Sequence, residues 1–188
     1  APQLVTVVGN QGTGKTRLAR EVLRRLSADG WPTGTATATE SARTTPLGAL
    51  AHLVPASAVA SPQTVFQATR AAIEADAGDR PLVLHVDDAH LLDPGSASLL
   101  VSLAEVDTVR LVLTVRSGAP MPDALAGLRR RDDSITRSLG SLDPIAIDTL
   151  LHRVLGAPLD GMAAAQLQRT SGGNPLYLRE LVLAAVAD

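Results

Sequence analysis

The sequence predicts an α/β fold, in which helices cover both faces of a parallel sheet and a small helical part follows. Two observations carry this prediction. Strand-like and helix-like patterns alternate up to about residue 140, and from Leu142 onward three helical patterns follow one another without a strand pattern between them. The chain has 188 residues, of which 45% are apolar, enough for one core domain with a small appendage. We therefore expect an α/β core over residues 1–141 and an α-helical lid subdomain over residues 142–188.

Short runs of β-branched and apolar residues mark the strands. They cover residues 4–8, 33–39, 82–86 and 109–115, and a weaker run covers residues 134–139. Apolar residues at helical spacing mark the helices. These patterns cover residues 15–28, 63–77, 96–105, 123–131, 145–155, 161–170 and 176–186, with a short helix near residues 47–53.

Composition excludes several classes of protein. The chain has no cysteine, hence no disulfide framework and no thiolate metal site, and the expected compartment is the cytoplasm. It has no apolar stretch of about 18 residues and no secretory signal pattern, so we expect no membrane span. A net charge of −2 and a pI near 6.1 argue against binding nucleic acid by bulk electrostatics. The basic run at residues 129–131 is followed by two aspartates and is interpreted as a solvated helix end.

Residues 9–16 have the sequence GNQGTGKT, which matches the phosphate-binding pattern G-x-x-x-x-G-K-[ST]. The segment lies between an apolar strand pattern and an amphipathic helix pattern, which is the context this motif requires. The fold class predicted from it is a three-layer P-loop NTPase. We expect nucleotide contacts from the whole segment and the next residue, namely Gly9, Asn10, Gln11, Gly12, Thr13, Gly14, Lys15, Thr16 and Arg17.

Each residue type in this motif has a chemical reason. Glycines allow backbone conformations in which N–H groups approach phosphate oxygens, and the following helix directs its positive dipole end at the same anion. Lys15, the single lysine among 17 basic residues, can reach the β- and γ-phosphates. The Thr16 hydroxyl is suited to ligate Mg²⁺. The motif therefore predicts ATP or ADP, or a closely similar nucleotide, bound with Mg²⁺.

A second acidic strand is expected beside the phosphate loop. The apolar run at residues 82–86 is followed by Asp87 and Asp88, in the form of a Walker B motif. We expect Asp87 to hold Mg²⁺ and Asp88 to orient or deprotonate the attacking water, although Asp88 could instead be a capping or salt-bridging carboxylate. His90 could hydrogen-bond to this pair, report on the γ-phosphate or fix the loop, whereas His85, inside the strand, is expected to be a core residue.

Arg116 follows the apolar strand at residues 109–115. If that strand lies between the phosphate-loop strand and the Asp87 strand, the order that defines the ASCE branch (to which AAA-like proteins belong), its end faces the γ-phosphate. Arg116 could then sense or neutralise charge on that group. The alternative is a surface ion-pair partner.

Four segments in this order resemble the nucleotide-binding module of STAND ATPases. They are GNQGTGKT, LVLHVDDAHLLDPGSASLL, LVLTVRSG and SGGNPLYLREL, and together they span nearly the whole chain. The sequence is most similar to the ATPase domain of large ATP-binding LuxR-type (LAL) transcriptional regulators and of SARP-LAL regulators. Residues 173–176 resemble the family's GxP element, which implies that Pro175 packs near the adenine. They are also consistent with a plain helix start, with Asn174 as the cap and Pro175 in the first turn.

The resemblance implies a signal-responsive switch in transcriptional control. ADP would hold a closed resting form, ATP with an inducer would favour an open form that self-associates, and slow hydrolysis would reset it. The family's GRExE-like segment upstream of the first strand is not in this sequence, and no helix-turn-helix or sensor repeat is visible. The chain is therefore expected to be an excised domain, with DNA bound by a missing part.

Two alternatives come from other classes of protein. A motor-type AAA+ ATPase would need an arginine finger and a lid arginine, for which Arg169 and Arg179 are candidates outside any diagnostic motif. A non-hydrolysing nucleotide-binding module or a small-molecule kinase is disfavoured, because the Asp87-Asp88 pair offers an agent for activating water.

Overall fold

The computed structural model describes residues 2–56, 58, 61–156 and 160–187. The chain forms two compact units. The sheet unit consists of Ala1–Val8 and Thr16–Ser138, and the helical unit consists of Gly9–Lys15 and Leu139–Asp188. The phosphate loop, except its last residue Thr16, is thus grouped with the C-terminal helices.

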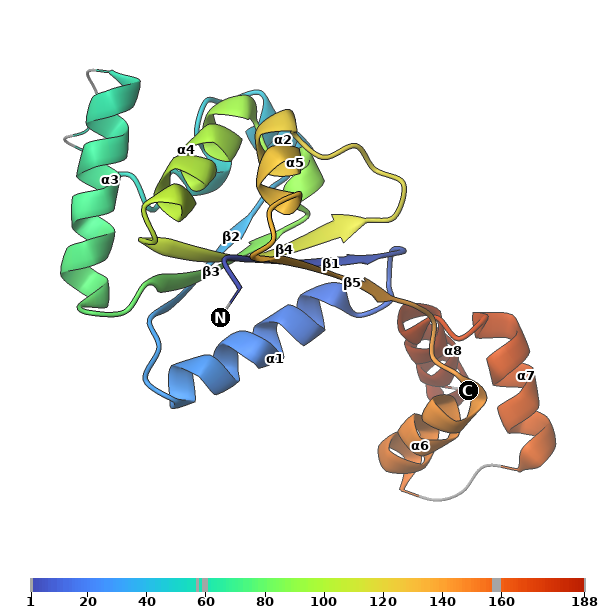
Figure 1. Ribbon diagram of the computed structural model, residues 1–188. Coiled ribbons are helices and arrows are strands. Elements are labelled where there is room, and N and C mark those ends of the chain that lie inside the picture. The colour runs from blue at the N-terminus through green and yellow to red at the C-terminus, as the bar shows by residue number, and fades with distance from the viewer. Residues whose placement is uncertain (1, 57, 59–60, 157–159, 188) are drawn as a thin grey trace. The chain divides into compact units, whose positions relative to one another are not determined.

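A five-stranded sheet is the framework of the sheet unit (Figure 1). The strands are β1 (Leu4–Gly9), β2 (Thr33–Thr37), β3 (Leu82–Asp87), β4 (Val109–Arg116) and β5 (Ser134–Leu139). Their order is β2-β3-β4-β1-β5, and β3 pairs in parallel with β2 and with β4. The strand that ends in Arg116 therefore lies between the phosphate-loop strand and the strand that ends in Asp87. This confirms the ASCE order on which the expectation for Arg116 depended.

Side chains of β3 alternate between two separate cores, as the period of a strand requires. Leu84 and Val86 are fully buried in the larger core, which includes most of the apolar residues of α4. Val83 belongs to a smaller cluster with Ala19 and Leu23 of α1. In Figure 1, α1 covers one face of the sheet, and α4 and α5 cover the other. Helices on both faces are what the alternating pattern predicted.

Local signals in the sequence account for the helices of the sheet unit. Two of them begin with a capping side chain followed by a proline in the first turn. The cap accepts a hydrogen bond from an unpaired N–H group of the helix start, and proline has no N–H group to leave unpaired there. Ser61 caps one and Asp93 the other. The helices are α1 (Lys15–Ala28), α2 (Glu40–Arg43), α3 (Pro62–Ala77), α4 (Pro94–Glu105) and α5 (Asp123–Arg129), with 3-10 turns at Gly48–Leu50 and Ala89–Leu91.

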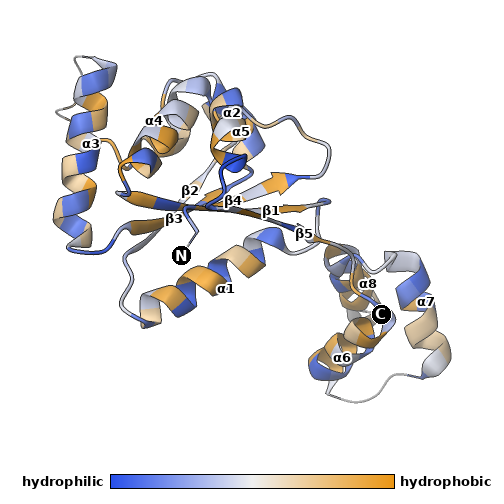
Figure 2. Ribbon diagram, in the orientation of Figure 1, coloured by the Kyte–Doolittle hydropathy of each residue, from blue (hydrophilic) through white to orange (hydrophobic). Residues whose placement is uncertain are grey.

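Three helices make up most of the helical unit, namely α6 (Pro144–Leu155), α7 (Gly161–Ser171) and α8 (Pro175–Ala187). Their common core contains Ile147, Leu151, Leu178 and Val182, and Figure 2 shows apolar residues recurring along α6 and α8. The Asp143 carboxylate accepts a hydrogen bond from Ala146 N and so caps α6. The predicted helical C-terminal part is therefore present.

The five expected strands and the seven longer expected helices are found, most of them within two residues of the predicted bounds. The short helix expected near residues 47–53 is only the 3-10 turn Gly48–Leu50, and the four-residue α2 was not predicted. Neither element is long enough to produce a periodic apolar pattern. Across the described part of the chain, no helix has the length and apolarity needed to cross a membrane.

Asp93 links α4 to the 3-10 turn at Gly48–Leu50. Its carboxylate accepts hydrogen bonds from Ser96 N at 2.9 Å and Leu47 N at 3.1 Å, and from the Ser96 hydroxyl. Burial raises the pKa of Asp93, but these hydrogen bonds outweigh burial and hold the pKa below its usual value. One side chain thus both caps α4 and holds a segment 46 residues earlier in the chain.

Replacing this side chain should destabilise the sheet unit. We expect Asp93→Ala to lower the free energy of unfolding by about 2–3 kcal/mol, because several hydrogen bonds are lost and the Leu47 N–H loses its acceptor. Denaturant unfolding at neutral pH measures the loss. Since the folded-state pKa is lowered, the contribution is complete above the unfolded-state pKa of about 3.9 and is lost as the pH falls through the folded-state pKa.

Ser61→Ala is the matched control, because Ser61 caps α3 with a single backbone hydrogen bond at an exposed site. It should cost about 1 kcal/mol or less. Equal losses for the two variants, or a loss for Asp93→Ala that persists in acid, would contradict this account of Asp93.

Candidate nucleotide-binding site

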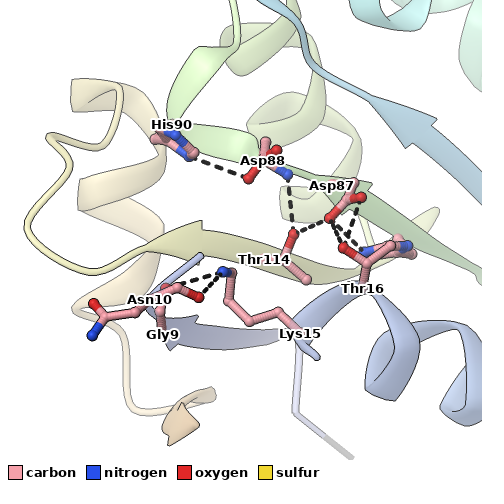
Figure 3. Close-up of polar contacts among 9 residues, drawn as sticks. Gly9, Asn10, Lys15, Thr16, Asp87, Asp88, His90 and Thr114 are labelled. Carbon is pink, nitrogen blue, oxygen red and sulfur yellow. Dashed lines mark hydrogen bonds and ion pairs between the residues drawn. The ribbon is translucent and has the colours of Figure 1, made fainter. Parts of the chain in front are cut away.

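The adjacent ends of β3 and β4 bring Asp87 and Thr114 together. Val86 and Leu113 are paired across the two strands, so the residues that follow them lie side by side. The Thr114 hydroxyl donates a hydrogen bond to Asp87 Oδ1 (Figure 3). The Thr16 hydroxyl, from the first turn of α1, donates to the same carboxylate, at 2.9 Å from Oδ1 and 3.0 Å from Oδ2. The fold thus brings together the two residues that the sequence predicted to hold Mg²⁺, and that role stays a prediction.

Thr114 is the residue of this group to which the sequence assigned no role. It is fully buried, and its hydroxyl accepts a hydrogen bond from Asp88 N at 3.0 Å while it donates to Asp87. Both bonding capacities of one hydroxyl are therefore used to hold the two consecutive aspartates. The signal that could have identified it is the single hydroxyl in a mainly apolar strand, two positions before the strand's exposed end at Arg116.

Asp88 lies where the chain leaves β3. Its backbone is left-handed, with φ 51 and ψ 45, a conformation that aspartate tolerates better than most residues. Its side chain is 43% exposed, and its Oδ1 atom lies 3.9 Å from His90 Nδ1 (Figure 3). Asp88 is therefore partly open to solvent beside a histidine.

His85 lies on the same face of β3 as Asp87 and is almost fully buried. Its Nε2 atom is 3.8 Å from Asp87 Oδ1. Burial lowers the pKa of His85, Arg20 lowers it further, and only the Asp87 carboxylate acts in the opposite direction. A neutral, buried histidine agrees with the expectation that His85 is a core residue.

Arg116 is exposed at the end of β4 and forms no ion pair with any residue in the described parts of the chain. The surface ion-pair alternative thus has no partner there. Arg17 is exposed on α1. Their predicted roles toward a nucleotide stay predictions.

In the part of the phosphate loop that belongs to the helical unit, Gly9–Lys15, side chains donate hydrogen bonds to the loop's own carbonyl groups. Lys15 Nζ donates to Gly9 O at 3.0 Å and Asn10 O at 2.9 Å (Figure 3), and Lys15 is 8% exposed. The Thr13 hydroxyl also donates to Asn10 O, at 2.9 Å. Gly12 and Gly14 have φ angles of 80 and 94, which only glycine adopts readily. These two glycines have the conformational role that the motif predicted.

Two glycines of the loop are also required by packing. A Cβ atom at Gly9 would lie 2.6 Å from Leu139 O and 2.8 Å from Thr13 Oγ1. A Cβ atom at Gly12 would lie 2.6 Å from Asn174 Oδ1 and 2.8 Å from Leu176 Cβ. Side chains at these positions would collide with neighbours within the helical unit. The explanation of Gly9 and Gly12 by phosphate approach alone was therefore incomplete.

Asn174 and Pro175 begin α8 next to this loop. Asn174 Oδ1 accepts a hydrogen bond from Leu176 N at 3.0 Å, so Asn174 is the expected cap, and Pro175 occupies the first helical position. Asn174 Nδ2 donates to Gln11 O at 2.9 Å, a contact that the sequence did not predict. The predicted adenine contact of Pro175 stays a prediction.

Thr16 and Asp87 have the chemistry that Mg²⁺ requires. A hydroxyl and a carboxylate from two elements converge within hydrogen-bonding distance, and both are hard oxygen ligands. Over the described residues there is no cluster of three or more His, Cys, Asp or Glu side chains that could enclose a metal. The pair suits a cation that takes its remaining ligands from phosphate and water, which is how Mg²⁺ is commonly bound in nucleotide sites.

The strand order, the glycine-rich loop before α1 and the acidic end of β3 define a P-loop nucleotide-binding fold. Within that class, the chain belongs to the AAA ATPase domain family, whose model matches residues 1–115. Proteins of this family bind ATP or ADP with Mg²⁺ and hydrolyse nucleotide. A search of the curated proteins gave no match.

Solved structures share the fold at low sequence identity. The ORC1 protein of Aeropyrum pernix, solved in complex with DNA, matches with 22% identity and a TM-score of 0.62, over 95% of this chain and 52% of that one. A RuvB mutant of Thermotoga maritima matches with 19% identity and a TM-score of 0.63, over 94% and 52%. PCH-2 of C. elegans matches with 16% identity and a TM-score of 0.55, over 85% and 42%. This chain thus spans about half the length of these proteins.

Removing the Thr114 hydroxyl should destabilise the ends of β3 and β4. Thr114→Val keeps the shape but leaves the Asp88 N–H without its acceptor, so we expect the free energy of unfolding to fall by about 1–3 kcal/mol. Thr6→Val is the matched control. Thr6 is also a fully buried strand residue, and its hydroxyl has no hydrogen-bond partner in the described structure. Denaturant unfolding should show little loss for Thr6→Val, and equal losses would refute the role given to Thr114.

Proposed function

We propose that this chain is an ATP-binding and slowly hydrolysing switch domain of a signal-responsive transcriptional regulator. The observation that supports it most directly is the contact of the Thr16 hydroxyl with the Asp87 carboxylate, at 2.9 Å and 3.0 Å. In a P-loop enzyme these two residue types hold Mg²⁺ beside the phosphates.

The proposed chemistry follows from the properties of the side chains. The backbone N–H groups of the phosphate loop and the Lys15 ammonium bind the β- and γ-phosphates. Thr16 and Asp87 hold Mg²⁺, which when bound neutralises charge on the phosphate oxygens. Asp88, partly exposed just after β3, orients the attacking water and accepts its proton. Arg116 stabilises charge on the terminal phosphate.

The proposed regulatory role rests on the sequence resemblance to STAND regulators of the LAL and SARP-LAL type. In this proposal residues 142–188 act as a lid whose position depends on whether ADP or ATP is bound. The ATP form self-associates, and DNA is bound by a part of the regulator outside these residues, in the cytoplasm. Grouping of the phosphate loop with the C-terminal helices in one compact unit supports a lid that senses the phosphates.

Asp88→Asn tests the hydrolytic step. The amide keeps the size of the side chain but cannot accept a proton, so phosphate release should fall by about 100-fold or more while ATP affinity changes little. A phosphate-release assay and calorimetric titration with ATP measure the two effects. Lys15→Ala is the contrasting variant and should abolish ATP binding itself. Turnover at the original rate in Asp88→Asn would remove Asp88 as the base.

Nucleotide-dependent assembly tests the switch. With ATP or a non-hydrolysable analogue we expect a larger assembly than with ADP, together with slow phosphate release. Light scattering after size exclusion, run beside the phosphate assay, measures both. Fast, steady turnover with the same assembly in both nucleotides would instead favour a motor-type AAA+ ATPase, and binding without any turnover would favour a nucleotide-binding module.

A further inference from the structure

Two carbonyl groups of the phosphate loop are bound by the beginning of α8. Gln11 O accepts a hydrogen bond from Asn174 Nδ2 at 2.9 Å, and Gly12 O accepts one from Leu176 N at 3.3 Å. Leu176 N donates at the same time to Asn174 Oδ1. All of these residues belong to the helical unit. The Asn174 amide therefore uses one end for the helix and the other for the loop.

These bonds determine the direction of two amide donors. The described peptide bonds are all trans, and in a trans peptide the carbonyl and the N–H that follows it point in opposite directions. The carbonyls of Gln11 and Gly12 point toward α8, so the N–H groups of Gly12 and Thr13 point to the other side of the loop. The Thr13 N–H accordingly donates a long hydrogen bond, 3.4 Å, to Asn10 O within the loop. Asn10 O also accepts a hydrogen bond from Lys15 Nζ, the group expected to reach the phosphates.

The loop backbone at Gly12 lies in close contact with the beginning of α8. A Cβ atom there would overlap both Asn174 Oδ1 and Leu176 Cβ. The contact thus depends on Gly12, which has no side chain to collide with α8, and on Asn174, which donates a hydrogen bond to the loop. An N-terminal helix cap alone would require only the Oδ1 atom, and serine or aspartate would supply that oxygen equally well.

We propose that Asn174 is a positioning residue for the phosphate part of the nucleotide. It holds the loop carbonyls toward α8, so that the Gly12 N–H is oriented for phosphate before the ligand arrives and the Thr13 N–H, bonded to Asn10 O without ligand, points to the same side. Asn174 does not touch the nucleotide itself. This proposal rests on the proposed nucleotide-binding function of the loop. It assigns to the Asn174 amide nitrogen a function that a helix cap lacks.

Two substitutions separate the cap from the donor. Asn174→Ser keeps an oxygen that caps α8 but is too short to replace the amide donor to Gln11. Asn174→Asp keeps the cap, removes the donor and places a carboxylate beside the Gln11 carbonyl. Asp143→Ser is the control in the same unit, because Asp143 caps α6 and, among the residues that the structure describes, forms no hydrogen bond with the phosphate loop. All are made in the 188-residue chain.

The readout is binding of ATP and of inorganic tripolyphosphate, each measured by calorimetry. Asn174→Ser should weaken both ligands by a similar factor, about fivefold to tenfold, the effect of one lost hydrogen bond. Asn174→Asp should weaken both further, and Asp143→Ser should weaken neither. Amide NMR shifts of Gly12 and Thr13 should change in the ligand-free Asn174 variants and stay unchanged in Asp143→Ser.

Unchanged affinity of Asn174→Ser for both ligands would overturn the positioning role while leaving the proposed function intact. Weaker ATP binding with unchanged tripolyphosphate binding would also overturn it, because Asn174 would then act on the nucleoside. If the wild-type chain bound neither ligand, the proposed function would fail, and this inference would fail with it.

Discussion

The Asp87 carboxylate, held by two hydroxyl groups, is the interaction on which the arrangement of the sheet unit's functional residues depends. A partly buried carboxylate is costly unless hydrogen-bond donors replace the water it has lost. Thr16 and Thr114 supply those donors from α1 and β4. They can do so because β4 pairs directly with β3 in a parallel register that aligns the strand ends. A hydroxyl donor stabilises the carboxylate without neutralising it, so the negative charge is retained where a cation would be bound.

The phosphate loop obeys a different constraint, which is the closeness of its backbone to α8. Gly12 combines a positive φ with a contact distance that excludes any side chain, so two independent requirements act at one position. Gly14 has a positive φ, but a Cβ atom there would meet nothing within 4 Å. The glycines of the motif are therefore not equivalent. Conformation explains Gly14, whereas packing against α8 must be added to explain Gly12.

Much of this fold could be predicted from the sequence, because its strands and helices are long enough to show their own periodicity. The Gly9–Thr16 motif and the Asp87-Asp88 pair were recognisable because each is a local pattern. The contacts of Thr114 and Asn174 could not be predicted. They join residues 27 and 163 positions apart in the chain, and they depend on strand register and on the placement of a helix. Local periodicity carries no information on such pairs. The short α2 escaped prediction for the related reason that four residues define no apolar face.

The two consecutive aspartates have different environments, and the backbone is the cause. Asp87 is the last residue of β3, so its side chain follows the alternation of the strand and is 15% exposed. Asp88 turns into a left-handed conformation, which breaks that alternation and leaves its side chain 43% exposed near His90. The Asp88 N–H bond to Thr114 compensates part of the cost of this conformation. The Thr114 hydroxyl is hydrogen-bonded to both residues and so fixes their relative position. A shielded carboxylate next to one open to water suits the proposed division between holding a cation and accepting a proton.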